Sequence, residues 1–241
     1  MFPISHTPCN DRTISYRHEF KYRISTEQLY VLREQLSEIM LPDPNAGNNG
    51  SYRIRSLYFD DCKNSSYYAN ANGTQPREKF RLRMYDGDLK TLRLELKRKE
   101  SAMTLKQSCA VTESMARTMM ACSTIPWDDE MKPLLKKFYI QQETSLLQPK
   151  TIVEYDRIPF VYPDGNVRIT LDLNTGVCSR VARFLDADIY AQPIMPSGTH
   201  LLEVKYDDFL PDFIYRSLQN KNLSLTTFSK YYLCRKYGGL L

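Results

Sequence analysis

Residues 77–84 read REKFRLRM and alternate basic with other side chains. Side chains of a β-strand point to its two faces in turn, so positions 77, 79, 81 and 83 share one face and Phe80, Leu82 and Met84 share the other. The pattern predicts a strand with an apolar core face and a face of four positive charges. Like charges on one face of a sheet repel, which indicates an anion that offsets them.

Period-2 alternation over several other segments predicts an antiparallel sheet. With the opening segment, the expected strands cover residues 16–24, 52–60, 77–85, 91–100, 103–111, 151–161, 167–173 and 200–206. The turn Asp86-Gly87-Asp88 predicts a hairpin. Ser25 and Gln28 form a capping-box signature for a helix that ends near Met40. Further helices are expected over 114–122, 128–142, 208–219 and 227–237, and residues 42–50 are expected to form a loop.

Most of these strands carry charges on one face. The charged positions are Glu19, Lys21, Arg53, Arg55, Arg93, Glu95, Lys97, Lys99, Arg168, Asp172, Glu203 and Lys205. One core face and one solvated face would be ordinary for an antiparallel sheet. An arginine-rich face shared by six or seven strands instead favours a common anion, because guanidinium groups bind phosphate or carboxylate in a bidentate manner.

A closed barrel accounts for these charged faces with one geometry. We expect an α+β fold: an antiparallel β-barrel tunnel of about eight strands, with a charged lumen and with helices packed on its apolar outer side. The interleaved carboxylates suggest a divalent cation, since magnesium or manganese is often held by one or two carboxylates and by substrate phosphates. Glu19, Glu95 and Glu203 are the candidate ligands.

Composition is consistent with one globular domain. The chain has 241 residues, of which 42% are hydrophobic, and 33 Lys and Arg against 28 Asp and Glu leave a net charge of +5. We expect a loose leader over residues 1–14 and a single tunnel domain over 15–241. The sequence shows neither a signal peptide nor a long apolar run, which predicts a cytoplasmic protein. The six cysteines form no C-x-x-C pair, so no zinc site is indicated.

The charged segments, taken in order, resemble the vacuolar transporter chaperone (VTC) domain, the polyphosphate polymerase branch of the triphosphate tunnel metalloenzymes in the CYTH-like superfamily. The resemblance extends from about residue 15 to 235. It is carried by YRHEFKY (16–22), IRSLYFDD (54–61), FRLRMY (80–85), LELKRK (94–99), YDR (155–157), VRITLD (167–172), LEVK (202–205) and FSKY (228–231).

The resemblance implies phosphate-binding roles for particular residues. It assigns a catalytic tunnel set of Lys21, Arg81, Arg83, Lys97, Arg157, Arg168 and Lys230, and phosphate contacts from Lys106, Tyr155 and Ser229. Alternation adds Arg55, Lys79, Lys99 and Lys205 to the substrate-binding candidates. Glu203 matches the metal-binding glutamate of the family and would hold Mn2+ or Mg2+. Two positions depart from the pattern: Arg17 stands at the first glutamate of the superfamily's opening strand, and the stretch around Asn70 lacks a basic residue.

The function implied is metal-dependent transfer of the γ-phosphate of ATP to a growing polyphosphate chain. The alternatives are a triphosphatase on the same fold and a non-catalytic module that binds polyphosphate or inositol polyphosphates. Nucleic acid is not expected as a partner, because interleaved glutamates oppose a phosphodiester track. The sequence does not determine the oligomeric state. A membrane-protein partner could accept the polymer, and such a partner would hold the protein at a membrane.

Overall fold

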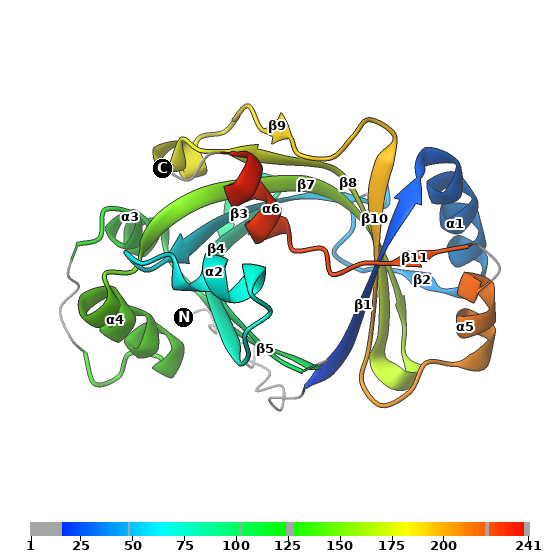
Figure 1. The fold of residues 1–241 in the computed structure, drawn as a ribbon, viewed down its shortest axis with the longest axis horizontal. Helices are drawn as coiled ribbons and strands as arrows, with labels where there is room; N and C mark the ends of the chain where they lie inside the picture. The colour runs from blue at the N-terminus through cyan, green and yellow to red at the C-terminus, as the bar shows by residue number, and fades with distance from the viewer. Residues whose placement is uncertain (1–15, 48, 102, 124–127, 220–221, 239–241) are drawn as a thin grey trace, which may run out of the picture.

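The computed structural model describes residues 16–47, 49–101, 103–123, 128–219 and 222–238, so the expected leader over 1–14 lies outside the described residues. Eight antiparallel strands close into a barrel in the order β1-β10-β8-β7-β3-β4-β5-β6 (Figure 1). They are β1 (Arg17–Ser25), β3 (Tyr52–Asp60), β4 (Arg77–Tyr85), β5 (Asp88–Glu100), β6 (Met103–Ala110), β7 (Gln148–Tyr162), β8 (Val167–Cys178) and β10 (Thr199–Tyr206).

The barrel confirms the fold class expected from alternation. β3 and β4 have the expected bounds, and the β4–β5 hairpin turns at Asp86 and Gly87, whose φ angles of 52° and 73° are those of a type I′ turn. The closing seam is short: β1 pairs with β6 only through Arg17 with Thr104 and His18 with Met103. Short strands β2 (Leu41–Pro42), β9 (Gln192–Pro193) and β11 (Ser224–Leu225) extend the sheet.

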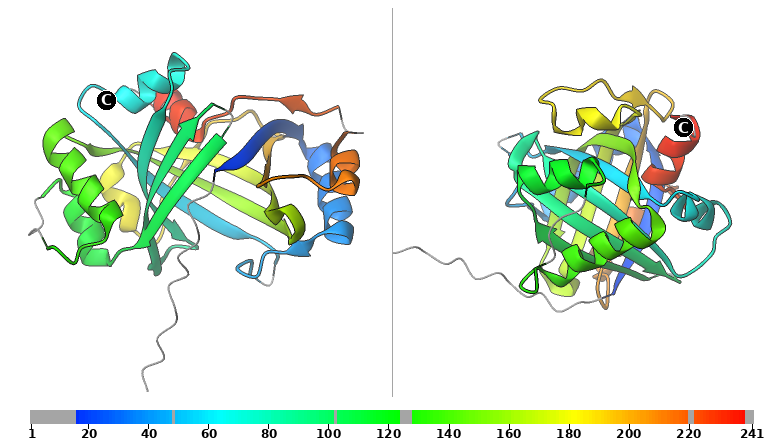
Figure 2. Two further views of the ribbon diagram at one scale, coloured as in Figure 1. Left: turned by 90° about the horizontal axis from the view of Figure 1, so that it is seen from below. Right: turned by 90° about the vertical axis from the view of Figure 1, so that its left-hand side faces the viewer.

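Helices cover the apolar outer side at both ends of the barrel (Figure 2). They are α1 (Thr26–Ile39), α3 (Glu113–Met120), α4 (Pro133–Ser145) and α5 (Asp212–Gln219), whereas α2 (Ser65–Ala71) and α6 (Lys230–Tyr237) contribute residues to the lining of the barrel interior. α1 and α5 bury Ile169 and Val204 at one end, and α3 and α4 bury Leu82 and Leu94 at the other. The barrel thus has apolar residues outside, and its interior holds the charged residues together with a smaller apolar cluster in which Tyr231 and Cys234 of α6 pack against Ile54 and Val153.

Local signals explain most helix boundaries. Ser25 and Gln28 form the expected capping box of α1. α4 begins later than expected, at Pro133, because proline is tolerated in the first turn of a helix. α6 also begins later, at Lys230, after Ser229 as its N-cap. Two single-turn 3₁₀ helices, η1 (Asp164–Asn166) and η2 (Val181–Leu185), follow β7 and β8.

Sequence patterning did not predict α2. The Asp60 carboxylate, which is fully buried, accepts hydrogen bonds from the backbone N–H groups of Ser66 and Tyr67 in its first turn and from the hydroxyl of Tyr231 in α6. This carboxylate therefore fastens α2 and α6 to the end of β3. Across the described ranges, none of the helices has the length and apolar character needed to cross a membrane.

Candidate functional site

The interior of the barrel holds a cavity of about 670 Å³. Among the described residues its lining includes thirteen lysines and arginines and three carboxylates. The basic residues are Arg17, Lys21, Arg77, Lys79, Arg81, Arg83, Lys97, Lys99, Lys106, Arg157, Arg168, Lys205 and Lys230, and the acidic ones are Glu19, Glu203 and Asp207. An enclosed excess of positive charge of this size attracts a multiply charged anion.

Most residues singled out in the sequence meet in this cavity. All seven of the expected catalytic set line it, and so do Lys79, Lys99, Lys106, Tyr155, Lys205, Ser229, Glu19 and Glu203. The β-register explains the convergence. Arg81 and Arg83 of β4 lie opposite Tyr58 and Ser56 of β3, on the inward face of both strands. Their roles in binding or catalysis stay predictions.

Glu95 lies behind the lining, buried under the β4 arginines. Arg81 Nη2 lies 2.6 Å from Glu95 Oε2, Lys106 Nζ lies 3.1 Å from Oε1, and Arg83 Nη1 lies 3.7 Å from Oε2. Burial alone would raise the pKa of Glu95, but Arg83, Arg81 and Lys106 hold that pKa well below its usual range. Glu95 is therefore ionised and fixes the guanidinium group of Arg81 at the cavity wall.

A second carboxylate cluster lies between β7, β8, β10 and α6. Arg157 donates to both oxygens of Asp172, at 2.6 and 2.7 Å. Lys230 Nζ donates to Asp172 at 2.5 Å and to Glu203 at 3.0 Å, and Lys205 donates to Glu203 at 2.5 Å. Burial alone would raise the pKa of Glu203. The neighbouring cations, led by Lys205 and Lys230, lower this pKa by more, so it lies well below its usual range.

Glu19 and Glu203 form the arrangement best suited to a divalent cation. Lys21 Nζ lies 3.1 Å from Glu19 and 3.7 Å from Glu203, and Lys97 donates to Glu19 at 2.7 Å. One ammonium thus lies between two ionised carboxylates, which are the hard oxygen donors that magnesium and manganese prefer. The described residues hold no cluster of three metal-ligating side chains. Both carboxylates are paired with lysines in this structure, and their role as metal ligands stays a prediction.

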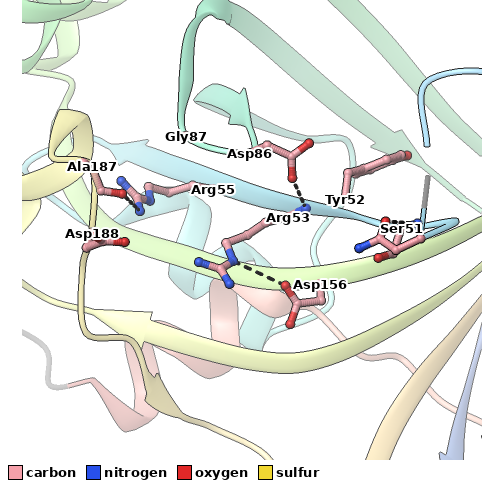
Figure 3. A pocket seen from close by; sticks show the side chains of 10 residues that line it. Ser51, Tyr52, Arg53, Arg55, Asp86, Gly87, Asp156, Ala187 and Asp188 are labelled. Atoms are coloured by element: carbon pink, nitrogen blue, oxygen red, sulfur yellow. Dashed lines mark hydrogen bonds and ion pairs between the residues drawn. The ribbon is translucent and has the colours of Figure 1, made fainter. Parts of the chain in front are cut away.

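Arg55 does not belong to the cavity, and placing it there was wrong. It points to the outside of β3, where its Nε donates to Glu154 Oε2 at 2.6 Å and its Nη atoms donate to the carbonyls of Phe184, Asp186 and Ala187. Figure 3 shows this guanidinium turned to the η2 loop. The small pocket there, of about 240 Å³, is lined by groups that mostly bind one another.

Arg53 shares that outward face. It lies 3.4 Å from Asp156 (Figure 3). The physical reason is the pairing with β4: Arg55 lies opposite Met84, so the odd-numbered residues of β3 share a face with the apolar residues of β4. The alternation of β3 identified its two faces but assigned the charged one to the wrong side.

The structure adds lining residues that were not among the candidates. Tyr58 accepts a hydrogen bond from Arg81 at 2.9 Å, and Tyr52 accepts one from Arg168 at 2.6 Å. Asn70 of α2 accepts one from Lys79 at 3.0 Å. Arg77 had a detectable signal, because it begins the basic alternation of residues 77–83. The tyrosines and Asn70 had none, since their position depends on strand pairing and on the unpredicted α2.

Comparisons with known proteins agree with this geometry. The profile of the VTC domain matches residues 16–237, so the chain belongs to the VTC-domain family. No curated protein matches the chain. Family membership and the cationic tunnel together support a polyphosphate-related function.

Two solved structures are similar to this chain at low sequence identity. A Bacillus halodurans protein described as a "putative adenylate cyclase" has a TM-score of 0.50 and 15% identity over 87% of this chain and 89% of its own. The PH1819 protein of Pyrococcus horikoshii has a TM-score of 0.48 and 15% identity over 92% of this chain and 99% of its own. The first similarity supports the tunnel fold.

Proposed function

We propose that the protein is a polyphosphate polymerase that transfers the γ-phosphate of ATP to the end of a polyphosphate chain. The observation that carries the proposal is the enclosed cavity with thirteen cationic and three acidic lining residues among those described. Phosphoryl transfer needs little covalent help from the protein. It needs reacting oxygens held in line and negative charge offset on the transferring group.

The arginines of the cavity are arranged to offset that charge. Arg81 and Arg157 are each held by a buried carboxylate, Glu95 and Asp172, so their guanidinium groups are fixed before substrate enters. Donors fixed in this way need no reorganisation during the reaction. Arg83 lies 3.2 Å or more from Ser56, Tyr155 and Glu95 and also donates to the neutral hydroxyl of Tyr85, so it can exchange neutral partners for a phosphate.

The lysines can exchange their carboxylate partners for phosphates. Lys21, Lys97, Lys205 and Lys230 all contact Glu19 or Glu203. An incoming phosphate would bind these ammonium groups and release the two carboxylates. Glu203 and Glu19 would then hold Mn2+ or Mg2+, which when bound offsets the charge on the phosphate oxygens.

Incubation of the purified protein with ATP and Mn2+ tests the proposal. We expect ADP and an acid-labile phosphate polymer in stoichiometric amounts. Orthophosphate as the sole phosphorus product besides ADP would instead identify a triphosphatase. Binding of polyphosphate without any turnover would identify a non-catalytic module.

Glu203→Gln tests the metal assignment. The amide keeps the size of the side chain but removes the charge that attracts the cation, and the rate should fall by at least about a hundredfold. ATP binding measured by calorimetry should persist, because Arg81 is held by Glu95 and Arg157 is held mainly by Asp172, with Glu203 only 3.5 Å away as a longer contact. Glu113→Gln, on the exposed surface of α3, is the matched control and should leave turnover unchanged. Near-normal turnover of Glu203→Gln would move the metal to Glu19 or Glu95.

A further inference from the structure

Three cations at one end of the cavity form no ion pair within 4.0 Å among the described residues, and only the more distant Asp60 and Glu19 act on Lys79 and Lys99. Arg77 and Lys79 lie at the start of β4, and Lys99 lies at the end of β5. Arg77 is directly opposite Lys99 in the sheet, and Lys79 is directly opposite Lys97. Like charges in directly opposite positions destabilise a sheet. This arrangement lowers stability unless an anion binds between them.

Their surroundings differ from those of the inner cations. Deeper in the cavity, Glu95, Asp172, Glu19 and Glu203 offset the arginines and lysines within ion-pair distance. At the start of β4, Lys79 Nζ instead contacts the neutral oxygens of Asn70 at 3.0 Å and of Ser229 at 3.3 Å and lies over the ring of Tyr231. Burial and then the neighbouring cations lower the pKa of Lys79 to about 7 and also lower the pKa of Lys99. Burial lowers the pKa of Arg77.

The opposite end of the same strand is aromatic. Positions 77, 79, 81, 83 and 85 of β4 all line the cavity, and eight residues of extended chain span roughly 26 Å. At the far end the rings of Tyr52 and Tyr85 meet edge to face, with their centroids 5.4 Å apart. The cavity therefore has an uncompensated cationic end and an aromatic end, joined by Arg81 and Arg83.

We infer that Arg77, Lys79 and Lys99 form a subsite for the phosphate chain beyond the reacting phosphates, so the polymer extends past the start of β4. The inference rests on the proposed function and gives the tunnel a direction. Each added phosphate brings negative charge, which three cations in succession can bind. A nucleoside is uncharged and gains more from aromatic surfaces, so the nucleotide is placed at the end of Tyr52 and Tyr85.

Equilibrium binding of two probes tests the subsite. Tripolyphosphate and a long polyphosphate of defined length are titrated, without metal or nucleotide, into the wild type and the double variant Arg77→Gln/Lys99→Gln. The wild type should bind the long chain more tightly than tripolyphosphate. The variant should lose about tenfold or more in affinity for the long chain, because two charge-assisted contacts are removed, and at most about twofold for tripolyphosphate.

The control and the outcomes separate this inference from the proposed function. Arg33→Gln/Lys90→Gln removes the same charge at exposed sites on α1 and β5, and should bind both probes like the wild type. The KM for ATP should not change in the Arg77/Lys99 variant. Three outcomes would overturn the subsite: the variant loses equal affinity for both probes, it loses affinity for neither, or its KM for ATP rises while its long-chain binding is unchanged. A wild type that only hydrolyses ATP but passes the binding test would refute polymerase activity and leave the subsite standing.

Discussion

β3 and β4 are neighbouring strands that each carry two arginines separated by one residue, and the two pairs have opposite surroundings. Arg55 lies outside the barrel, where one carboxylate and three backbone carbonyls accept from its guanidinium. Arg83 lies inside, where its contacts with Ser56 and Tyr155 are 3.2 Å long and Glu95 is 3.7 Å away. A guanidinium with four of its five N–H donors used stabilises the protein, and one whose contacts are long is available to bind a ligand.

Of the substitutions in these two arginine pairs, the one expected to have the largest effect on turnover is inside the barrel. Arg83→Ala should lower kcat/KM for ATP by about 10²- to 10³-fold, the loss usual for one donor that stabilises transition-state charge. Glu95 keeps Arg81 and Lys106 as partners, so the free energy of unfolding should change by less than about 1 kcal/mol. Steady-state kinetics and denaturant unfolding of the same preparation check both values. A variant that unfolds would show that Arg83 has a structural role.

For the arginine outside the barrel, we expect a loss of stability and no loss of turnover. Arg55→Ala should lower the free energy of unfolding by about 3 kcal/mol, because it leaves Glu154 and three carbonyls without their buried donor. Turnover per folded molecule should remain that of the wild type. Arg53→Ala is the matched control: its side chain is 54% exposed and has one 3.4 Å ion pair, so its loss should cost less than about 0.5 kcal/mol. Loss of turnover in folded Arg55→Ala protein would contradict the assignment.

The same pair of strands shows how far sequence reasoning extends. Alternation predicted the bounds of β3 and β4 and the inward direction of Arg81 and Arg83, because period 2 is a local property of a strand. It could not decide which face of β3 is inside. That choice depends on pairing with β4 and on the η2 loop, about 130 residues later, whose carbonyls bind Arg55.

Residues of the site that depend on distant contacts were missed for a similar reason. Asp172 follows the alternation of β8, yet its role as the partner of Arg157 and Lys230 arises only when β7, β8 and α6 come together. Asn70 lies on α2, whose first turn is capped by Asp60 from the end of β3 and not by a hydroxyl residue at its own N-cap. The helix propensities of the α2 residues do not indicate such a cap, because the capping carboxylate belongs to a residue outside the helix.

The smallest effect concerns Lys79, which shares the inward face of β4 with Arg81 but has no carboxylate partner. Burial and then repulsion from nearby cations lower the pKa of Lys79 to about 7. The charged or polar groups around it are Arg77 of β4, Lys97 and Lys99 of β5, Lys21 of β1, Asp60 of β3, Asn70 of α2, and Ser229 and Tyr231 at the start of α6. In the free protein Lys79 is therefore mostly charged at pH 6 and mostly neutral above pH 8.

A bound phosphate favours the charged ammonium and raises its pKa, so binding above pH 7 takes up a proton and weakens as the pH rises. Between pH 7 and 9 the affinity for long polyphosphate should fall about fivefold from this group, which corresponds to about 1 kcal/mol for a partly exposed ion pair. The Lys79→Arg variant keeps its positive charge between pH 7 and 9, so its affinity for long polyphosphate should not show this fall of about fivefold. Any contribution from Lys205, whose pKa burial lowers to about 8, is common to both proteins. Identical pH profiles for the two proteins would show that Lys79 does not contact the bound chain.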